Sequence, residues 1–301
     1  MGMATISLRD HTGAQLSSLC RAVGFSEFDD EPIRLLRDLL GPVGTRPLSQ
    51  PPAWDSDVAD DATPAEFSVA FDEDGSATVR VLIEPVAAQP GLRTNMELST
   101  RLVHSLAERF GFSLDQYHAI SELFLPVEPR GRFCFFSIDL HESVHPRVKV
   151  YLAHHAADAA TVERAAQPTP GIEPGRLAEF CRLIGDGTGL FTRRPLISSY
   201  AFVAGDTDRP SGYTLYLPVR DYVPDDAAAR ARVIDLMARR GLDPTVLDRA
   251  LNAVARRSLA DGVGLIPHVS LRLGRLRPGI TVYLCSEAYE IAPPRAAALV
   301  S

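Results

Sequence analysis

Alternating apolar and polar residues form a short strand pattern that returns four times along this chain. Each occurrence has aliphatic residues at every second position, the two-residue period of a β-strand with one buried face. The four segments are 79–83, 148–152, 213–217 and 280–284. Equivalent positions in them, at 82, 151, 216 and 283, are 69, 65 and 67 residues apart. So regular a period predicts a repeated supersecondary unit.

Each of these segments is predicted to be the second strand of a hairpin. The first strands are expected at 66–71, 132–140, 198–203 and 268–273, with turn residues between the two members of each pair. Apolar spacing and helix-stop residues predict helices over 96–110, 114–124, 156–165, 175–183 and 245–259, the last with Pro244 at its first helical position. The predicted unit is therefore helix, helix, strand, strand.

The N-terminal part of the chain lacks this unit. Residues 16–40 are largely helical by pattern, and residues 42–63, rich in Pro, Asp and Ser, are expected to form a loop. We predict one domain over 1–301, with an N-terminal helical segment at 1–60 followed by the repeats at 61–301.

The polar residues of the repeated strands share one face of the predicted sheet. If the aliphatic face were exposed, the strands would present a large apolar patch to water, so helices are expected to cover it. The basic and phenolic face is then expected to look inward, toward a cavity. A half-solvated antiparallel sheet that keeps this face in water is the alternative.

Composition sets broad limits on the kind of protein. Hydrophobic residues make up 46% and charged residues 23%, and the mean hydropathy is −0.01, values typical of a soluble globular protein. No apolar run approaches the roughly 18 residues of a membrane span, and no signal-peptide pattern is visible, so a cytoplasmic location is expected. The net charge of −7 without a basic stripe argues against nucleic acid as a partner.

The cysteines show no metal-ligand spacing and lie in apolar runs, so we expect buried free thiols, no disulfide and no zinc. They are Cys20, Cys134, Cys181 and Cys285. The histidines are expected at helix surfaces, in a turn or at a strand end, as surface or capping residues rather than catalytic ones. They include His104, His118, His141, His145, His154 and His155.

Cations on the inward face require an explanation, because a buried Arg or Lys needs a carboxylate partner or an anionic ligand. Arg80 and Lys149 lie on this face, Arg147 precedes Lys149 by two residues, and the last hairpin adds Arg272 or Arg275. A diphosphate suits such a group of charges. The alternative is a solvated network of Arg80 and Lys149 with acidic neighbours, namely Glu66, Glu84 or Asp139.

Three tyrosines occupy equivalent positions on the repeated strands: Tyr151, Tyr216 and Tyr283. Aromatic faces beside a diphosphate pocket stabilise a carbocation by about 0.5 to 2 kcal/mol each. Taken individually these residues are ordinary core tyrosines, but as a group beside bound diphosphate they indicate prenyl chemistry.

Several segments together carry a resemblance to a known family. They are 65–68, 80–85, 146–152, 216–222 and 282–284 running into 287–289. Through them the chain resembles, over roughly residues 60 to 290, the aromatic prenyltransferases of the ABBA fold, specifically the bacterial dimethylallyltryptophan synthase (indole prenyltransferase) family. The resemblance implies an α+β fold, an ααββ-repeat (ABBA, or PT-barrel) antiparallel β-barrel with a central lumen surrounded by an outer ring of helices.

The resemblance also implies an activity and roles. The enzyme is expected to transfer a dimethylallyl group from dimethylallyl diphosphate to an indole or related aromatic such as a tryptophan derivative, an indole alkaloid or a carbazole, in secondary metabolism, with no cofactor or obligatory metal, as a monomer or homodimer. Glu66 is expected to accept the indole N–H. The diphosphate is assigned to Arg80, Arg147, Lys149 and Arg272, and cation shielding to Tyr151, Tyr216 and Tyr283.

The chain also departs from the family pattern. The pattern lacks one repeat unit, which leaves eight recognisable strands where ten are expected and removes the family's usual proton-accepting lysine. An eight-stranded barrel with a narrower lumen, an inactive chain, or closure through a partner chain are the alternatives. No Asp-Asp-x-x-Asp motif occurs, and Asp60-Asp61 and Asp225-Asp226 are expected in loop or helix-cap contexts.

Two other functions remain open on sequence alone. One is a non-catalytic barrel that binds a phosphorylated or hydrophobic ligand, for which the lacking unit is the argument. The other is a phosphatase or other hydrolase, which is disfavoured because no nucleophile and base occur at a motif spacing.

Overall fold

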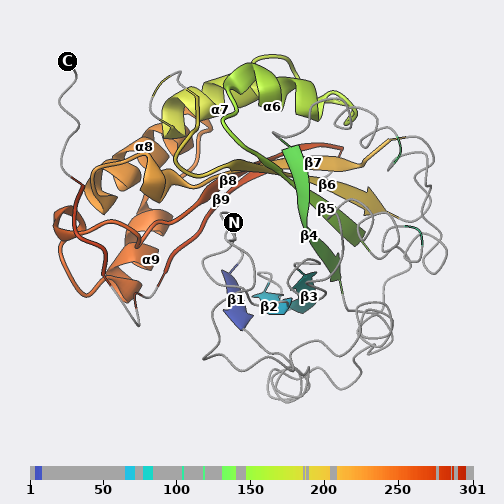
Figure 1. Cartoon of the computed structure of the whole chain (residues 1–301). Coiled ribbons are helices and arrows are strands. Elements are labelled where there is room, and N and C mark those ends of the chain that lie inside the picture. Colours follow the sequence, from blue (N-terminus) through green and yellow to red (C-terminus); the bar gives the residue numbers. More distant parts are fainter. Residues whose placement is uncertain are drawn as a thin grey trace, which may run out of the picture. The chain divides into compact units, whose positions relative to one another are not determined.

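A computed structural model describes residues 147–185, 187, 190–203, 209–275, 278–285, 287 and 291–295 (Figure 1). It also gives the strand positions of 4–8, 65–71, 77–83 and 131–139, and His104 and His118 as single helical, exposed residues. The chain divides into two compact units: residues 1–153 with 199–211, and residues 154–198 with 212–301. The predicted helices at 16–40, 96–110 and 114–124, the loop at 42–63, His141 and His145 otherwise lie outside the described residues.

The first unit is built on consecutive antiparallel strands. They are β1 (Ala4–Leu8), β2 (Ala65–Phe71), β3 (Ala77–Ile83), β4 (Gly131–Asp139) and β5 (Arg147–His154). Antiparallel pairing joins β1 to β2, β2 to β3 and β3 to β4. The hairpins predicted from alternation are confirmed to within about two residues at each end. The strand β1 was not predicted.

The second unit repeats a helix, helix, strand, strand order, as predicted. The first repeat has α6 (Ala159–Ala166), α7 (Arg176–Ile184), β6 (Leu196–Val203), which the two units share, and β7 (Gly212–Leu217). The second has α8 (Asp226–Arg239), α9 (Thr245–Val254), β8 (Val269–Gly274) and β9 (Gly279–Val282), with short 3₁₀ turns η2 (Val219–Asp221) and η3 (Leu259–Asp261). Strands β7, β8 and β9 pair antiparallel in that order.

Two boundaries in the last repeat differ from the prediction. Pro244 takes the N-cap position of α9 rather than its first helical position, and α9 ends at Val254 because Ala255 has extended backbone (ψ 130°). The helix α8 was not among the predicted helices, although the stop residues at 240–241 mark its end. None of the helices that the structure describes is both long and apolar enough to cross a membrane.

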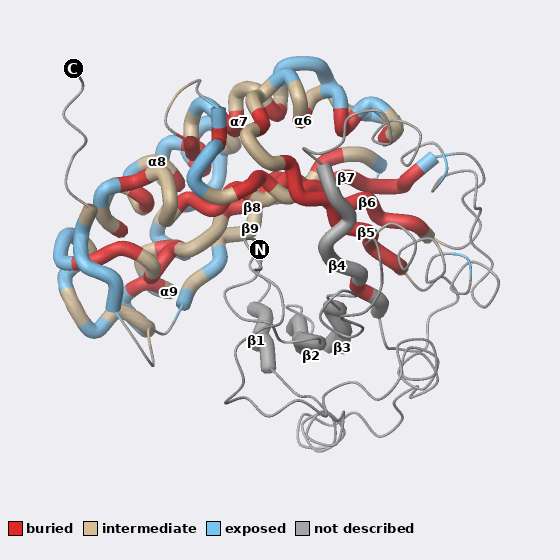
Figure 2. The backbone as a smooth tube through the Cα atoms, viewed as in Figure 1, coloured by how far each residue is buried: buried red, intermediate tan, exposed pale blue. Residues whose placement is uncertain are grey.

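Helices cover the aliphatic face of β7, as predicted. Leu215 and Leu217 are fully buried, and α7 packs against β7 and β8. Tyr213, on the same face, donates its hydroxyl to the carbonyl of Val162 in α6 at 3.4 Å. Figure 2 shows β7 and β8 mostly buried and β9 intermediate, with exposed residues on the outer side of the helices. The alternation in the sequence therefore identifies the helix-facing side of the sheet.

Charged side chains tie the helix ends to neighbouring backbone. The carboxylate of Asp158 accepts the backbone N–H of Thr161 at 2.7 Å and so caps α6, and hydrogen bonds from Thr161 lower the pKa of Asp158. Glu163 in α6 accepts the N–H groups of Leu177 and Ala178 at the start of α7, both at 3.0 Å. Because these bonds are charge-assisted, they fix the helices to each other as well as satisfying their ends.

The thiol prediction holds for one of the two cysteines whose side chains are described. Cys181 is buried in α7, and burial raises the pKa of its thiol to about 12. Cys285 is exposed, against the prediction, because it follows the end of β9 rather than continuing that strand.

A buried polar chain corrects the prediction for His154. This residue was expected at the surface or as a cap, but it is 2% exposed and its Nε2 lies 2.7 Å from the Ser198 hydroxyl. The Ser198 hydroxyl in turn lies 2.5 Å from the hydroxyl of Tyr213. Burial raises the pKa of this tyrosine well above its usual range. The alternation of β5 places His154 on the same face as Val148, so it extends the strand's buried side.

This burial predicts a pH-dependent stability. Burial, with a smaller contribution from the charge of His155, lowers the pKa of His154 from 6.5 to about 4, so the unfolded chain binds this proton at a higher pH than the folded chain does. Stability is therefore lost as the pH falls from about 6.5 toward 4, by about 2 kcal/mol between pH 7.5 and pH 5. Denaturant unfolding at these two pH values measures the loss.

The variant His154→Gln lacks the titrating group and is expected to lose about 2 kcal/mol less than the wild type over the same pH interval. His155→Gln is the matched control, because it changes the adjacent histidine and leaves the buried one in place. A wild-type pH dependence in His154→Gln contradicts the assignment.

Candidate functional site

The strand register of the first unit brings several predicted site residues to one face. Glu66 lies opposite Leu82, and Leu82 lies opposite Ser137. Arg80 lies opposite Ser68 on one side and Asp139 on the other. Directly opposed residues of antiparallel strands share a face. Glu66 and Arg80 therefore occupy the same face, and only their strand positions are described.

Strand β5 adds its alternate residues to this face. The hydroxyls of Tyr151 and Ser137 are 3.2 Å apart, which places Tyr151 on the face that Ser137 shares with Leu82. Arg147 and Lys149 have the same parity as Tyr151 on β5. Lys149 is 7% exposed and Tyr151 8%, so this side of β5 is buried as well as the aliphatic side. The burial that the sequence predicted for Lys149 is confirmed.

The register also bears on the alternative in which Arg80 pairs with an acidic neighbour. Arg80 and Asp139 are directly opposite on β3 and β4, so a carboxylate residue stands at the position next to this arginine. A cross-strand charge pair at this position and an anionic ligand are both compatible with the register.

The second unit gathers a separate group of predicted residues on one face of β7, β8 and β9. Tyr216 lies opposite Ser270, and Thr214 lies opposite Arg272. Arg272 is also opposite Gly279, where a Cβ atom would stand 3.2 Å from Arg272 Nη2. The glycine thus leaves room for the guanidinium group.

Two of the predicted cation-shielding tyrosines meet in this unit. The rings of Tyr216 and Tyr283 are 6.2 Å apart between centroids, in a tilted arrangement. Tyr283 is 37% exposed, whereas the polar neighbours Thr214 and Ser270 are buried. A pair of partly accessible phenol rings on the face that carries a guanidinium group suits a ligand with a cationic carbon and an anionic leaving group.

Sequence reasoning did not assign a role to His268. Its ring stands edge-to-face against Tyr283, with centroids 6.3 Å apart. The alternation in the sequence could have placed His268 on this face, because it precedes Ser270 and Arg272 at the same two-residue spacing.

The acidic pair Asp225-Asp226 has the cap context that the sequence predicted. Asp225 caps α8 by accepting the backbone N–H of Ala228 at 2.7 Å, and Asp226 is the first helical residue. The Asp226 carboxylate accepts backbone N–H groups from residues 264–266. Among the residues that the structure describes, no three His, Cys, Asp or Glu side chains are grouped as metal ligands.

Residues that follow Tyr216 in the motif at 216–222 have structural contacts. Tyr222 donates its hydroxyl to the carbonyl of Arg194 at 2.7 Å, and Asp221 accepts Nη2 of Arg295 at 2.9 Å. These bonds tie η2 to the segment before β6 and to residues near the C-terminal end. We therefore place this part of the motif in the framework of the second unit.

A pocket of about 330 Å³ in the second unit lies apart from the predicted residues. Its lining comes from α6, α7 and the segment after α7, and includes Ala159, Cys181, Arg182 and Phe191. None of the predicted site residues lines it, so this pocket does not test the site.

Comparison with known proteins gives the family. The family model described as "Tryptophan dimethylallyltransferase" matches residues 9–131. The chain is 38% identical to 6-dimethylallyltryptophan synthase from Micromonospora olivasterospora, solved in complex with DMASPP and Trp, and the match covers 96% of this chain and 100% of that one with a TM-score of 0.57.

Two further structures agree. PriB, solved in a ternary complex with L-tryptophan and dimethylallyl thiolodiphosphate, is 34% identical over 94% of this chain and 97% of its own, with a TM-score of 0.52. NotF prenyltransferase is 16% identical and has a TM-score of 0.69 over 94% of this chain and 79% of its own, a likeness of fold.

The lacking repeat unit stays a prediction. The match spans 100% of the Micromonospora protein, and the described residues include nine strands, one more than the eight recognised in the sequence. The additional strand is β1, which does not carry the repeated pattern and has its pairing partner far away in sequence.

Near-complete coverage at this identity decides the assignment. This chain belongs to the tryptophan dimethylallyltransferase family of aromatic prenyltransferases and has their α+β fold.

Proposed function

We propose that this protein transfers the dimethylallyl group of dimethylallyl diphosphate to the indole ring of tryptophan, without an obligatory metal. The observation that carries the proposal is the end-to-end match to 6-dimethylallyltryptophan synthase at 38% identity. The buried Lys149 and the paired rings of Tyr216 and Tyr283 support it, because they supply charge for a diphosphate and aromatic faces for a cation.

The proposed reaction begins with departure of the diphosphate. The bond between C1 of the allyl group and the diphosphate oxygen breaks, and the electron pair leaves with the oxygen. The side chains assigned to the diphosphate are Arg80, Arg147, Lys149 and Arg272. Fixed positive charges where negative charge develops lower the barrier without reorganisation at the moment of reaction.

Carbon–carbon bond formation follows. A ring carbon of the indole donates an electron pair to the allyl cation, and the ring then loses its proton and regains aromaticity. The products are prenylated tryptophan, diphosphate and one proton. Tyr151, Tyr216 and Tyr283 are assigned to shield the cation, and exclusion of water protects it from hydrolysis.

Glu66 is assigned to the indole N–H. A carboxylate that accepts this hydrogen bond raises the electron density of the ring, and the interaction strengthens as positive charge develops on the indole during attack. No observation on the fold or from the comparisons favours the non-catalytic alternative.

The overall reaction is testable directly. In EDTA, the purified protein is expected to convert tryptophan and dimethylallyl diphosphate into a product heavier by one C5H8 group, detected by mass spectrometry, and to release an equal amount of diphosphate. The same reaction with added magnesium is the control. Turnover that requires magnesium contradicts the metal-independent part of the proposal, and absence of product contradicts the transfer itself.

Replacement of Glu66 tests the indole contact. Glu66→Gln is expected to lower turnover 10- to 100-fold with little change in stability, since a hydrogen bond to a charged group contributes about 1.5 to 3 kcal/mol. Steady-state kinetics with tryptophan measure the effect. Glu173→Gln, at an exposed carboxylate that pairs with Arg176, is the control, and equal rates in both variants contradict the assigned role.

Replacement of Lys149 tests the diphosphate contact. Lys149→Ala is expected to weaken binding of inorganic diphosphate at least tenfold in calorimetry, because one fixed charge is lost from a buried position. Lys149→Arg keeps the charge and is expected to restore most of the affinity. Undiminished affinity in Lys149→Ala removes this residue from the diphosphate site.

A further inference from the structure

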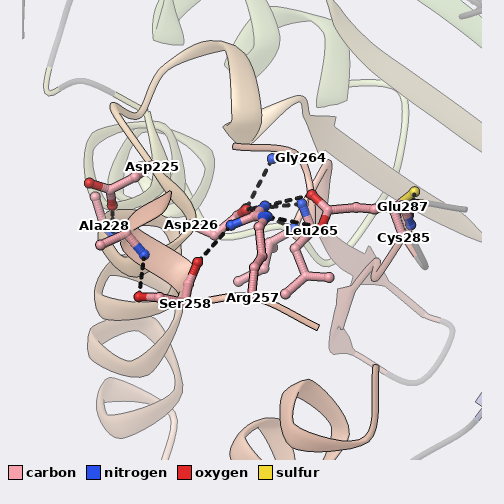
Figure 3. A network of polar contacts seen from close by, with 11 residues as sticks. Asp225, Asp226, Ala228, Arg257, Ser258, Gly264, Leu265, Cys285 and Glu287 are labelled. Carbon is pink, nitrogen blue, oxygen red and sulfur yellow. Dashed lines mark hydrogen bonds and ion pairs between the residues drawn. The ribbon is translucent and has the colours of Figure 1, made fainter. Parts of the chain in front are cut away.

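Arg257 joins two carboxylates that are distant in sequence, as Figure 3 shows. Its Nη2 lies 2.5 Å from Asp226 Oδ2 and 2.5 Å from Glu287 Oε1, and its Nε donates to Glu287 Oε2 at 3.0 Å. The side chains are 9%, 0% and 8% exposed for Arg257, Asp226 and Glu287. We call these three residues the Arg257 network.

Burial alone lowers the pKa of Arg257, but its hydrogen bonds to Glu287 and Asp226 outweigh burial and raise the pKa above the usual value. The guanidinium group is therefore charged, and the bidentate contact with Glu287 fixes its plane. Removal of one partner leaves an uncompensated buried charge, so the geometry is held strongly.

Asp226 carries the network into the backbone that leads to β8. Its carboxylate accepts the N–H groups of Gly264 and Ile266 at Oδ1 and of Leu265 at Oδ2, at 3.0 to 3.1 Å. Its own N–H donates to the carbonyl of Gly262 at 3.0 Å. One aspartate thus joins the start of α8 to the loop that enters β8.

Glu287 carries the network to the segment after β9. In this segment the N–H of Cys285 donates to the carbonyl of Leu265 at 2.9 Å, and the N–H of Tyr283 donates to the carbonyl of His268 at 3.0 Å. Glu287 has a left-handed backbone (φ 50°), which costs about 1 to 2 kcal/mol for a residue with a Cβ atom. The ion pair with Arg257 offsets this cost and fixes the end of the segment.

Tyr283 lies within this segment, which the ion pair of Glu287 and the backbone hydrogen bonds of Tyr283 and Cys285 hold in place. Strand β9 ends at Val282, so the position of the tyrosine depends on the bond from its N–H to the His268 carbonyl. It also depends on the contacts of Cys285 with Leu265 and of Glu287 with Arg257. Its ring is partly exposed and packs beside Tyr216. A shift of the segment therefore changes the spacing of the two rings directly.

We propose that the Arg257 network holds Tyr283 in position. The position of this ring then determines what fraction of the allyl cation reacts with the indole ring and what fraction reacts with water. This inference rests on the proposed function. A misplaced ring leaves one side of the cation open, and a displacement of about 1 Å has large kinetic effects in such sites. In the uncoupled reaction, water oxygen bonds to the allyl cation and loses a proton, which gives dimethylallyl alcohol and diphosphate.

Glu287→Asn is the principal test. Asparagine tolerates the left-handed backbone but is one methylene shorter, so it breaks the contact with Arg257 without adding backbone strain. The measured quantity is the ratio of prenylated tryptophan to diphosphate released in the same reaction. We expect this ratio to fall at least fivefold from the wild-type value, while diphosphate release stays within threefold.

Glu163→Gln is the matched control. Glu163 is also a carboxylate that accepts backbone N–H groups, but it lies in α6 and the hydrogen bonds described for it come from the start of α7. A general loss of stability affects both variants, whereas the product ratio is expected to change only in Glu287→Asn. Should that variant fail to fold, Glu287→Gln is the second variant. Its side chain has the same length as glutamate and keeps one acceptor oxygen, so a smaller shift in the product ratio is expected.

Amide hydrogen exchange separates this inference from the proposed function. The amides of Tyr283 and Cys285 are expected to exchange at least tenfold faster in Glu287→Asn than in the wild type, whatever the activity. Unchanged exchange contradicts the claim that the Arg257 network holds this segment in place. Faster exchange with an unchanged product ratio contradicts the claim that this positioning affects the reaction. A wild-type protein that releases diphosphate but forms no prenylated tryptophan overturns the proposed function instead.

Discussion

Burial of both faces of the strands β5, β6 and β7 is the constraint on which the described part of this structure depends. On β5, every residue from Val148 to His154 is buried, including Lys149 and Tyr151 on the polar side. One side can be apolar and packed, but buried polar groups cost stability unless they have partners. The polar side therefore requires hydrogen bonds such as that between Tyr151 and Ser137, and partners for its charged groups.

The same chemistry holds the framework and the proposed site in place. Carboxylates accept backbone N–H groups at the starts of α6, α7 and α8, and Arg232 donates from α8 to the carbonyls of Ile184 and Tyr222, both at 3.0 Å. The Arg257 network applies this scheme to the segment that carries Tyr283. Charges in the second unit thus fix backbone first, and through the backbone they fix the aromatic side chains.

The sequence predicted most of what alternation encodes. The strands, their pairing into hairpins and the shared face of Arg80 and Leu82 follow from the two-residue period and the turn residues. The register, which sets Leu82 opposite Glu66 and Ser137, comes from the structure. The period also carried the signal for His154, whose parity matches Val148, yet its position at a strand end suggested a surface residue. Tertiary burial decided the outcome.

Contacts between distant segments could not be predicted in this way. Arg257 and Glu287 are 30 residues apart, and no local pattern marks their pairing. Strand β1 has only five residues and pairs with a partner beyond residue 64, so it shows neither hairpin spacing nor a turn signal. This long-range pairing explains why the sequence analysis recognised eight strands and not β1.

The hydrogen-bond partners of Asp225 and Asp226 show that these two carboxylates serve the framework. Asp225 and Asp226 face backbone N–H groups, and Asp226 also faces a guanidinium group, so their oxygen atoms are committed to hydrogen donors. An anionic substrate needs positive charge, and the residues proposed for this role include Lys149 and Arg272 on the polar strand faces. Asp226 thus serves the framework, whereas Lys149 is proposed to bind diphosphate, so variants of Asp226 should alter stability and variants of Lys149 should alter affinity.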